Sequence, residues 1–420
     1  MKTIVKITLK IFLLLLATST LSAQEDPDSL RNSAINIFMD CWRCDMDYIR
    51  RAIPYVNYVR DVREADVYIL QTTQSSGSGG QEYTFTFNGQ KAFAGMNDTL
   101  VYHSNPDDTR DQTREGTTKI LSMGLMRYVA RSPLFNEVDI SHLGVSEEDE
   151  VEDNWNYWVF EIEMDPDFEL EESRKSMNWD NSLEASRITH AMKYEFRADM
   201  RFRETKYTYE DTTYISNRNS WSVDNLIVFS LSEHWSAGAR IDLSSSTYRN
   251  LRSSFDAIPS IEYNIFPYSE STRRQLRMLY GMGYTYNNYL DTTIYNKTTE
   301  HLLEQTLDIA YQVQQKWGSV NISLEASSYL HDLSKNMIEL DGRINIRILK
   351  GLSFSVRGGA ARINNQITLP KGDLDEAEIL LELQERQTAY RIEGGIGFTY
   401  TFGSIYNNIV NPRFGSGRYY

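Results

Sequence analysis

The feature that most constrains this chain is a two-residue alternation of apolar and polar side chains, which starts near residue 154 and runs almost to the C-terminus. Residues 336–350, NMIELDGRINIRILK, show the alternation most clearly. Their apolar positions are Ile338, Leu340, Ile344, Ile346 and Ile348. A period of two indicates a β-strand with one apolar and one polar face. In a soluble sandwich the apolar face would meet a second sheet, whereas in a membrane barrel it would meet lipid and the charges would face the lumen.

The connections between the alternating stretches favour the barrel, because short and long ones alternate. The short connections are residues 188–191, 232–235, 267–274, 316–319 and 350–352, and the longer ones include residues 209–217, 287–300, 330–336 and 364–387. Bacterial outer-membrane barrels have short periplasmic turns, longer outer loops and an even number of strands. We therefore expect residues 154–402 to form an antiparallel transmembrane β-barrel of about twelve strands in the outer membrane.

The first 23 residues predict export. Lys2, Lys6 and Lys10 form a basic region, residues 11–17 an apolar core, and Ser22-Ala23 a cleavage site, so residues 1–23 are expected to be a signal peptide. A membrane anchor is the alternative, but its apolar run would be short. The formal net charge of −15 argues against a nucleic-acid partner.

Residues 24–143 predict a small periplasmic α+β domain. We expect strands at 35–39, 55–60, 65–74, 82–88, 91–93 and 99–102, a helix capped by Asp45, and a second helix from residue 108 or 109 to about residue 130. The element order and the stretch ADVYILQTTQSSGSGGQEYTFTF resemble periplasmic α/β domains of the Tol-system and curli-secretion type. That resemblance implies a protein-binding or assembly module and carries over no catalytic residues.

Two further features lie outside the barrel. Cys41 and Cys44 are expected to form a local disulfide or a pair of thiols. A redox CxxC would need a thioredoxin-like unit, and a metal site would need two more ligands. The acidic residues 144–153, GVSEEDEVED, are interpreted as a solvated linker, since a calcium loop would need a turn glycine and ordered oxygen spacing.

The charged files of the barrel strands are expected to face the lumen. These residues are Lys193, Glu195, Arg197, Asp199, Arg201, Arg203, Glu339, Asp341, Arg343 and Arg347. Their signs alternate closely, so they can form ion pairs across neighbouring strands. One interpretation is a polar interior braced by ion pairs with little open pore. The other is a narrow selective channel lined by charge.

The final strand, EGGIGFTYTF at residues 393–402, looks like the assembly signal of outer-membrane barrels. Its signal residues are Gly395, Phe398, Tyr400 and Phe402. The resemblance implies the barrel-assembly machinery as a partner, alongside outer-membrane lipid. Residues 403–420 then form an expected C-terminal periplasmic tail that folds back or binds a partner.

Three phrases together are similar to an outer-membrane β-barrel protein family of Bacteroidetes and related bacteria. They are DCWRCDMDYIRRAIPYVNYVRDVREADVYIL, IEYNIFPYSESTRRQLRMLYG and YTFGSIYNNIVNPRF. The resemblance implies export, a barrel and an N-terminal periplasmic α/β domain. It brings no known activity and no site residues.

Motifs for chemistry are weak. His331, Asp332 and Ser334 suggest nucleophilic catalysis, but polar loop residues are the simpler interpretation. SGSGG at residues 76–80 lacks the Lys-Ser/Thr of a phosphate loop and predicts a hairpin turn. We expect no cofactor, no metal and no enzyme. The leading hypothesis is a barrel that anchors a periplasmic domain, which binds another periplasmic or outer-membrane protein in envelope assembly, secretion or integrity. The alternatives are a porin-like solute channel and a barrel enzyme.

Overall fold

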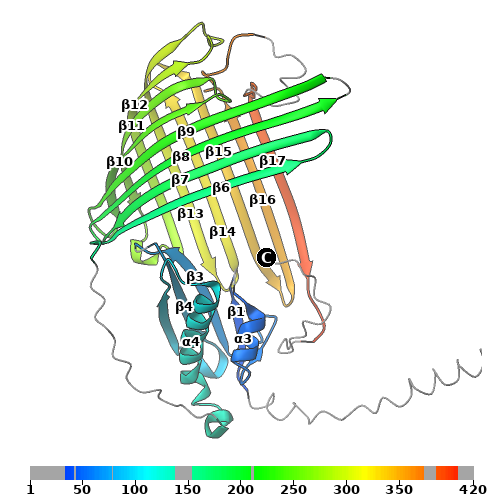
Figure 1. Cartoon of the computed structure of the whole chain (residues 1–420). Coiled ribbons are helices and arrows are strands. Elements are labelled where there is room, and N and C mark those ends of the chain that lie inside the picture. Colours follow the sequence, from blue (N-terminus) through cyan, green and yellow to red (C-terminus); the bar gives the residue numbers. More distant parts are fainter. Residues whose placement is uncertain are drawn as a thin grey trace, which may run out of the picture.

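The protein, seen in a computed structural model, contains two β-sheets, one of five strands and one of twelve (Figure 1). The structure describes residues 34–41, 44–77, 79–137, 154–209, 212–372 and 385–404. The expected signal peptide, the acidic linker and all but the first two residues of the expected tail lie outside the described residues. Among the helices that are described, none is both long enough and apolar enough to cross a membrane.

The N-terminal domain consists of the five-stranded sheet, of order β2-β1-β3-β4-β5, with two α-helices. Strand β1 runs parallel to β2 and β3, while β3, β4 and β5 are antiparallel. The elements are β1 (Asn36–Asp40), α3 (Met46–Ala52), β2 (Asn57–Tyr58), β3 (Val67–Ser75), β4 (Gln81–Gly89), η1 (Lys91–Phe93), β5 (Asn97–His103), α4 (Arg110–Val129) and η2 (Pro133–Glu137).

Side-chain caps explain where both helices start. The Asp45 carboxylate accepts a hydrogen bond from the backbone N–H of Tyr48 at 2.9 Å, so α3 begins immediately after Asp45. Thr109 and Gln112 form a reciprocal capping box at the start of α4. The two helices expected from the sequence are therefore confirmed.

The domain has its own apolar core between the sheet and the helices. Phe85 and Phe87 from β4 are fully buried against Leu121 and Leu125 of α4. Close packing needs a small residue on the helix, because a Cβ at Gly124 would lie 2.2 Å from the Phe87 ring. A self-contained core of this kind allows the domain to hold its shape independently of the larger sheet.

One expected strand of this domain is wrong, and another is shorter than expected. Residues 91–93 form the short 3-10 helix η1, which follows β4 as part of its connection to β5. Only Asn57 and Tyr58 of the stretch 55–60 pair as a strand. Both stretches are too short for periodicity to separate a strand from a turn or to fix the ends of a strand.

The twelve-stranded sheet is antiparallel, and its strands follow one another in sequence order, which confirms the expected strand number. The strands are β6 (Trp158–Leu170), β7 (Arg174–Ile188), β8 (Met192–Tyr209), β9 (Thr212–Ser230), β10 (Trp235–Ser246), β11 (Leu251–Asn264), β12 (Arg274–Tyr289), β13 (Thr299–Gln315), β14 (Gly318–Tyr329), β15 (Asp332–Leu349), β16 (Leu352–Ile363) and β17 (Tyr390–Tyr400). Strands β6 and β17 form its two edges, and the described residues show no pairing between them.

Two of the expected long loops are instead strand. Residues 212–217 belong to β9, and residues 332–336 belong to β15. Tyr209 pairs directly with Thr212, and Tyr329 pairs with Asp332. Their few apolar side chains, Tyr214, Ile215 and Leu333, do not recur at every second position, so these strand ends lack the alternation by which the sequence marks a strand.

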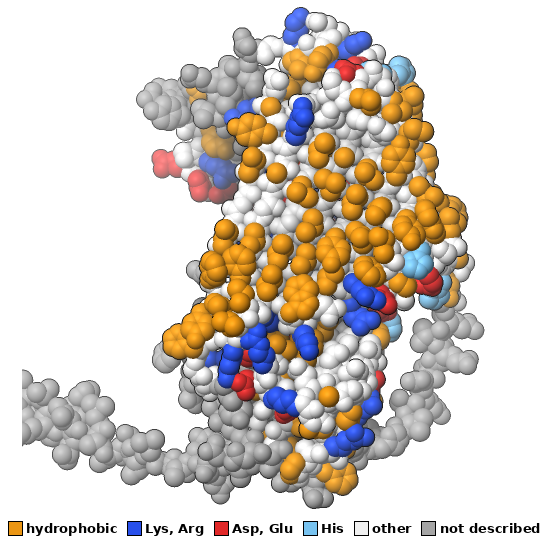
Figure 2. Space-filling model, turned by 180° about the vertical axis from the view of Figure 1, so that it is seen from behind, with side chains coloured by type: hydrophobic (Ala, Val, Ile, Leu, Met, Phe, Trp, Pro, Cys, Tyr) orange, Lys and Arg blue, Asp and Glu red, His pale blue; other side chains and the backbone are white. Residues whose placement is uncertain are grey.

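The two faces of the large sheet differ in chemistry. Apolar side chains cover the outer face, as Figure 2 shows for one side of the molecule. Examples from four strands are Trp179, Tyr280, Leu340 and Ile396, each more than two-fifths exposed. A continuous exposed apolar surface of this extent is unusual for a soluble protein and typical of a surface that contacts another apolar phase or partner.

Candidate functional site

The inner face of the twelve-stranded sheet carries the charged residues that the alternation selected. On β8, Arg197 forms ion pairs with Glu184 of β7 and with Asp199, the latter at 2.7 Å. Arg201 pairs with Asp180 at 2.7 Å. Lys193 pairs with Glu195 at 2.9 Å, and Arg203 donates a hydrogen bond to Asn178 at 2.9 Å. The charges on this side of the sheet therefore brace β7 against β8.

The opposite wall, β15 to β17, has a different arrangement. Glu339 forms an ion pair with Arg391 across β16. Arg343 of β15 stands directly opposite Arg357 of β16 on the same face. Neither of these two arginines has an ion pair with any described residue. Like charges directly opposite one another are destabilising in a sheet, so this pair of arginines costs stability where it stands.

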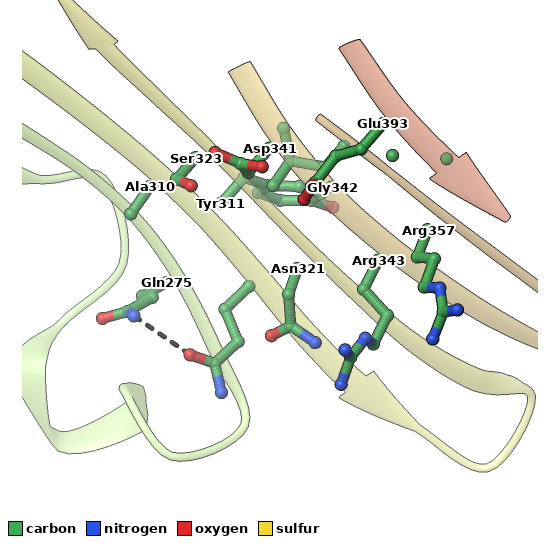
Figure 3. A pocket seen from close by; sticks show the side chains of 14 residues that line it. Gln275, Ala310, Tyr311, Asn321, Ser323, Asp341, Gly342, Arg343, Arg357 and Glu393 are labelled. Atoms are coloured by element: carbon green, nitrogen blue, oxygen red, sulfur yellow. Dashed lines mark hydrogen bonds between the residues drawn. The ribbon is translucent and has the colours of Figure 1, made fainter. Parts of the chain in front are cut away.

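A cavity of about 740 Å³ lies against these arginines. Figure 3 shows that the Arg343 and Arg357 side chains extend in the same direction, beside Asn321. Asp341 and Glu393 line another part of the cavity. It is thus a polar pocket with both signs of charge, and its lining comes from the six strands β12 to β17.

Three aspartates on the inner face stand in register on neighbouring strands, namely Asp224, Asp242 and Asp256. Ser222 donates to Asp224 at 2.9 Å, and Thr285 donates to Asp256 at 2.6 Å. In the part of the chain that the structure describes, no group of three or more His, Cys, Asp or Glu side chains converges closely enough to hold a metal ion. Hydroxyl groups thus bind the two outer aspartates of the row, whereas Asp242 between them has a buried Oδ1 atom without a hydrogen-bond partner among the described residues.

The end of the sheet farthest from the N-terminal domain, here called the distal end, is covered by residues 364–371. Ile367 and Leu369 are 2% and 5% exposed. Ile367 packs with Leu302 and Tyr329, which belong to the inner face of β13 and β14. These contacts were not predicted from the sequence, because residues 364–371 were expected to belong to a polar outer loop.

Hydrogen bonds fix this distal segment in place. The backbone N–H of Ile294 donates to the Leu369 carbonyl at 2.9 Å. The Asn250 side chain donates to the carbonyls of Asp291 and Thr368, at 3.0 and 2.8 Å. The segment therefore reaches from β16 to the loops after β10 and β12, and it covers part of the space enclosed by the sheet.

The other end, here called the proximal end, contacts the N-terminal domain. Arg347 lies on the same face of β15 as Arg343, but its guanidinium reaches the domain and pairs with Asp40 of β1 at 3.0 Å. The same guanidinium lies 5.1 Å from the centre of the Phe38 ring. Tyr68 also donates a hydrogen bond to Asp40 at 2.8 Å. Burial, followed by the neighbouring Asp40 charge, raises the pKa of Tyr68, so its hydroxyl stays a donor.

The turn between β15 and β16 makes three further contacts with the domain, all to the loop before β3. Lys350 forms an ion pair with Glu64. The backbone N–H of Gly351 donates to Asp61 at 2.7 Å, and Arg63 donates to the carbonyl of Ile348 at 3.0 Å. The hydrogen bond to Glu64 raises the pKa of Lys350, which favours the charged form of this ammonium group.

A second contact lies at the far tip of the domain. The turn between β3 and β4 packs so closely against the sheet that a Cβ at Gly77 would lie 2.8 Å from the Ile188 carbonyl oxygen. A Cβ at Gly79 would lie 2.8 Å from Val159 of β6. The domain therefore touches the proximal end at two places, near β6 to β8 and at the β15–β16 turn.

Cys41 and Cys44 form a disulfide directly after β1. The side chain of Gln71 from β3 contacts both sulfur atoms. Asp40, the ion-pair partner of Arg347, is the last residue of β1 and immediately precedes Cys41. The disulfide thus lies next to the junction between the domain and the large sheet.

The residues of the expected assembly signal lie at the sheet edge. Gly395 faces the inside of β17, while Phe398 and Tyr400 face outward. The Phe398 ring packs against Phe354 of β16 with ring centres 4.8 Å apart. Phe402 follows the end of β17 and is 78% exposed.

His331, Asp332 and Ser334 do not build a catalytic arrangement. The Ser334 hydroxyl donates to Asp332 at 2.6 Å, and the Ser334 backbone N–H also donates to Asp332 at 3.1 Å. The His331 ring instead neighbours Tyr329. These bonds are those of a polar turn at the start of β15.

Comparison with known proteins brings no relative: no protein-family model matches the chain, and no curated protein is significantly similar to it.

Proposed function

We propose that this protein is an outer-membrane β-barrel whose barrel holds the N-terminal domain at the periplasmic face of the membrane. In this account the chain is not an enzyme, and the domain binds another envelope protein in assembly, secretion or envelope integrity. The observation that carries the proposal is the docking of the domain on the proximal end of the sheet at two separate places.

The membrane location is supported by strand length and surface chemistry. Every strand of the large sheet has at least 11 residues, and about 9–11 residues of tilted strand cross a bilayer. The apolar outer face would meet lipid and the charged inner face the lumen. An even number of strands lets the first and last strands run antiparallel, so that the sheet can close on itself. The resemblance in sequence to an outer-membrane family agrees with this proposal.

Anchoring is favoured over transport because other parts of the chain cover some of the space at both ends of the proposed lumen. Residues 364–371 pack into the distal end through Ile367 and Leu369. The N-terminal domain bridges the proximal end from the β7–β8 turn to the β15–β16 turn. A solute that entered through the covered part of either end would have to displace these contacts.

A porin-like solute channel is the second candidate, and the cavity beside Arg343 and Arg357 favours it. Purified protein reconstituted in planar bilayers separates the two. The anchor proposal expects no steady current from the chain without its signal peptide. A steady ion-selective current that changes on Arg343→Glu would favour the channel.

The interaction role is tested by photo-cross-linking in intact cells. Val101 on the edge strand β5 and Met123 of α4 are 40% and 59% exposed. A photoreactive residue at either position should give a discrete adduct with an envelope protein. The fully buried Phe85 provides the matched control position. No adduct from any exposed position of the domain would contradict the proposal.

A further inference from the structure

The two edges of the large sheet are left unpaired within the described residues, although they match in direction. Because twelve strands alternate in direction, β6 and β17 run antiparallel to one another. An edge strand presents a row of unpaired backbone N–H and C=O groups, and in a membrane such groups must find partners. Some strand must therefore cover each edge, and the inner-face charges indicate which one.

The inner face of β6 is a row of carboxylates. Glu169 is paired with Arg174, and Asp167 accepts a hydrogen bond from Asn178 of β7. Glu161, Glu163 and Asp165 have no ion pair with any residue that the structure describes. On β7, Glu184 and Asp180 stand opposite Glu161 and Asp165, and both already form ion pairs with arginines of β8. Ser182 stands opposite Glu163. One edge of the sheet thus carries three negative charges that lack a positive partner.

The other edge offers positive charge at the same face. Gly395 and Gly397 place no side chain on the inner face of β17. Arg357 fills this space, since a Cβ at Gly395 would lie 3.0 Å from its Nε atom. The Arg357 side chain therefore extends over β17 towards the open edge, with Arg343 beside it.

We propose that β6 pairs with β17 and brings Glu161, Glu163 and Asp165 into the cavity beside Arg357 and Arg343. This inference rests on the proposed barrel and adds the residues that meet at its seam. Pairing the strands end to end sets Trp158 opposite Tyr400 and Glu163 opposite Gly395. A shift of two residues either way puts Glu161 or Asp165 there instead.

The geometry permits these contacts in all three registers. Strands β16 and β6 would lie about 10 Å apart with β17 between them. Extended arginine and glutamate side chains together span such a distance across glycine. The carboxylates of β6 then fill the polar cavity, so the pocket is a braced seam of the barrel and not a solute site.

Cysteine cross-linking tests the closure. In a Cys41→Ser/Cys44→Ser background, Ile162→Cys is combined with Ile396→Cys, both on the outer face. Phe160→Cys or Met164→Cys with Ile396→Cys tests the shifted registers. Oxidation of membrane-folded protein should produce an intramolecular cross-link, seen as a mobility shift, for one pair above the others. Absence of any intramolecular cross-link, or a cross-linked dimer in its place, would overturn both closure and the proposed barrel.

Charge exchange tests the seam itself. Arg357→Glu should slow the favoured cross-link at least tenfold, and adding the matching acid-to-arginine change, Glu163→Arg in the end-to-end register, should restore the rate. An unchanged rate in Arg357→Glu would overturn the seam contacts while leaving the barrel intact. If inorganic phosphate raises the unfolding temperature of the unmodified chain but not that of Arg357→Gln, the arginines bind soluble anions instead and the inference fails.

Discussion

Removing the Arg347 side chain should loosen the N-terminal domain from the large sheet. The Arg347–Asp40 pair is half-buried, at 27% and 20% exposed, and its N–O distance is 3.0 Å. A hydrogen bond to a charged group contributes about 1.5–3 kcal/mol. The contact with Phe38 adds about 0.5 kcal/mol for an arginine near an aromatic ring at a partly exposed site. Arg347→Ala should therefore weaken docking by about 2–3.5 kcal/mol.

Hydrogen exchange at Gly351 measures this change, because its N–H donates across the junction to Asp61. If exchange at this amide requires undocking, a loss of about 2–3.5 kcal/mol corresponds to roughly 30- to 300-fold faster exchange. Peptides covering residues 347–355, followed by mass spectrometry, report the rate. Arg347→Lys should recover part of the protection, since it keeps the charge but loses the planar guanidinium.

Arg273→Ala provides the matched control. Arg273 lies on another proximal turn, and its side chain contacts no described residue of the domain. Its loss should leave exchange at Gly351 within about twofold of the unmodified chain. An Arg347→Ala variant whose exchange rises less than threefold would refute the argument that this residue holds the domain in place.

Three further perturbations test other parts of the account. Phe87→Ala empties a fully buried position and should lower the free energy of unfolding of the domain by about 3–5 kcal/mol. Thermal melting followed by circular dichroism should show the domain unfolding at a lower temperature and the large sheet at an unchanged one. A lower unfolding temperature of both parts would contradict an independent core. Cys41→Ser/Cys44→Ser removes a disulfide between residues three apart in sequence, and the loss of this constraint on the unfolded chain should lower the free energy of unfolding by about 2 kcal/mol. A reductant should change the denaturant unfolding of the unmodified chain but not that of this variant. Ile367→Asp places a charge beside Leu302 and Tyr329 and should release the distal segment. Planar bilayers containing this variant should show new channel openings, and bilayers containing the control Thr368→Ser should not. If Ile367→Asp gives no channel openings, this segment does not seal the lumen.

The strands and helices were largely predictable from local patterns. The alternation is clear in β15 because one face of the middle of this strand is apolar. The capping residues Asp45 and Thr109 mark the starts of the two helices. Local patterns failed where apolar residues do not recur at every second position, as at the start of β9 and of β15. There the hydrogen-bonded ladder continues although no apolar face marks it.

The junction was not predictable, because its partners are far apart in the chain. Asp40 and Arg347 are 307 residues apart, and nothing local distinguishes Arg347 from Arg343 on the same face of β15. The position of Arg347 at the proximal end, where β15 leaves the sheet, decides its partner. Ile367 and Leu369 were likewise hidden within a stretch whose neighbours are polar.

The central claim is that the domain sits on the proximal end of a membrane barrel. Glu64→Cys with Lys350→Cys, in the Cys41→Ser/Cys44→Ser background, tests it most directly, since these residues are in contact across the junction. Oxidation of isolated outer membranes should cross-link the pair within the chain, and Glu64→Cys with Lys371→Cys at the distal end should not. Chain that fractionates as a soluble protein, or membranes in which both cysteines react with a thiol reagent yet never cross-link, would contradict the account.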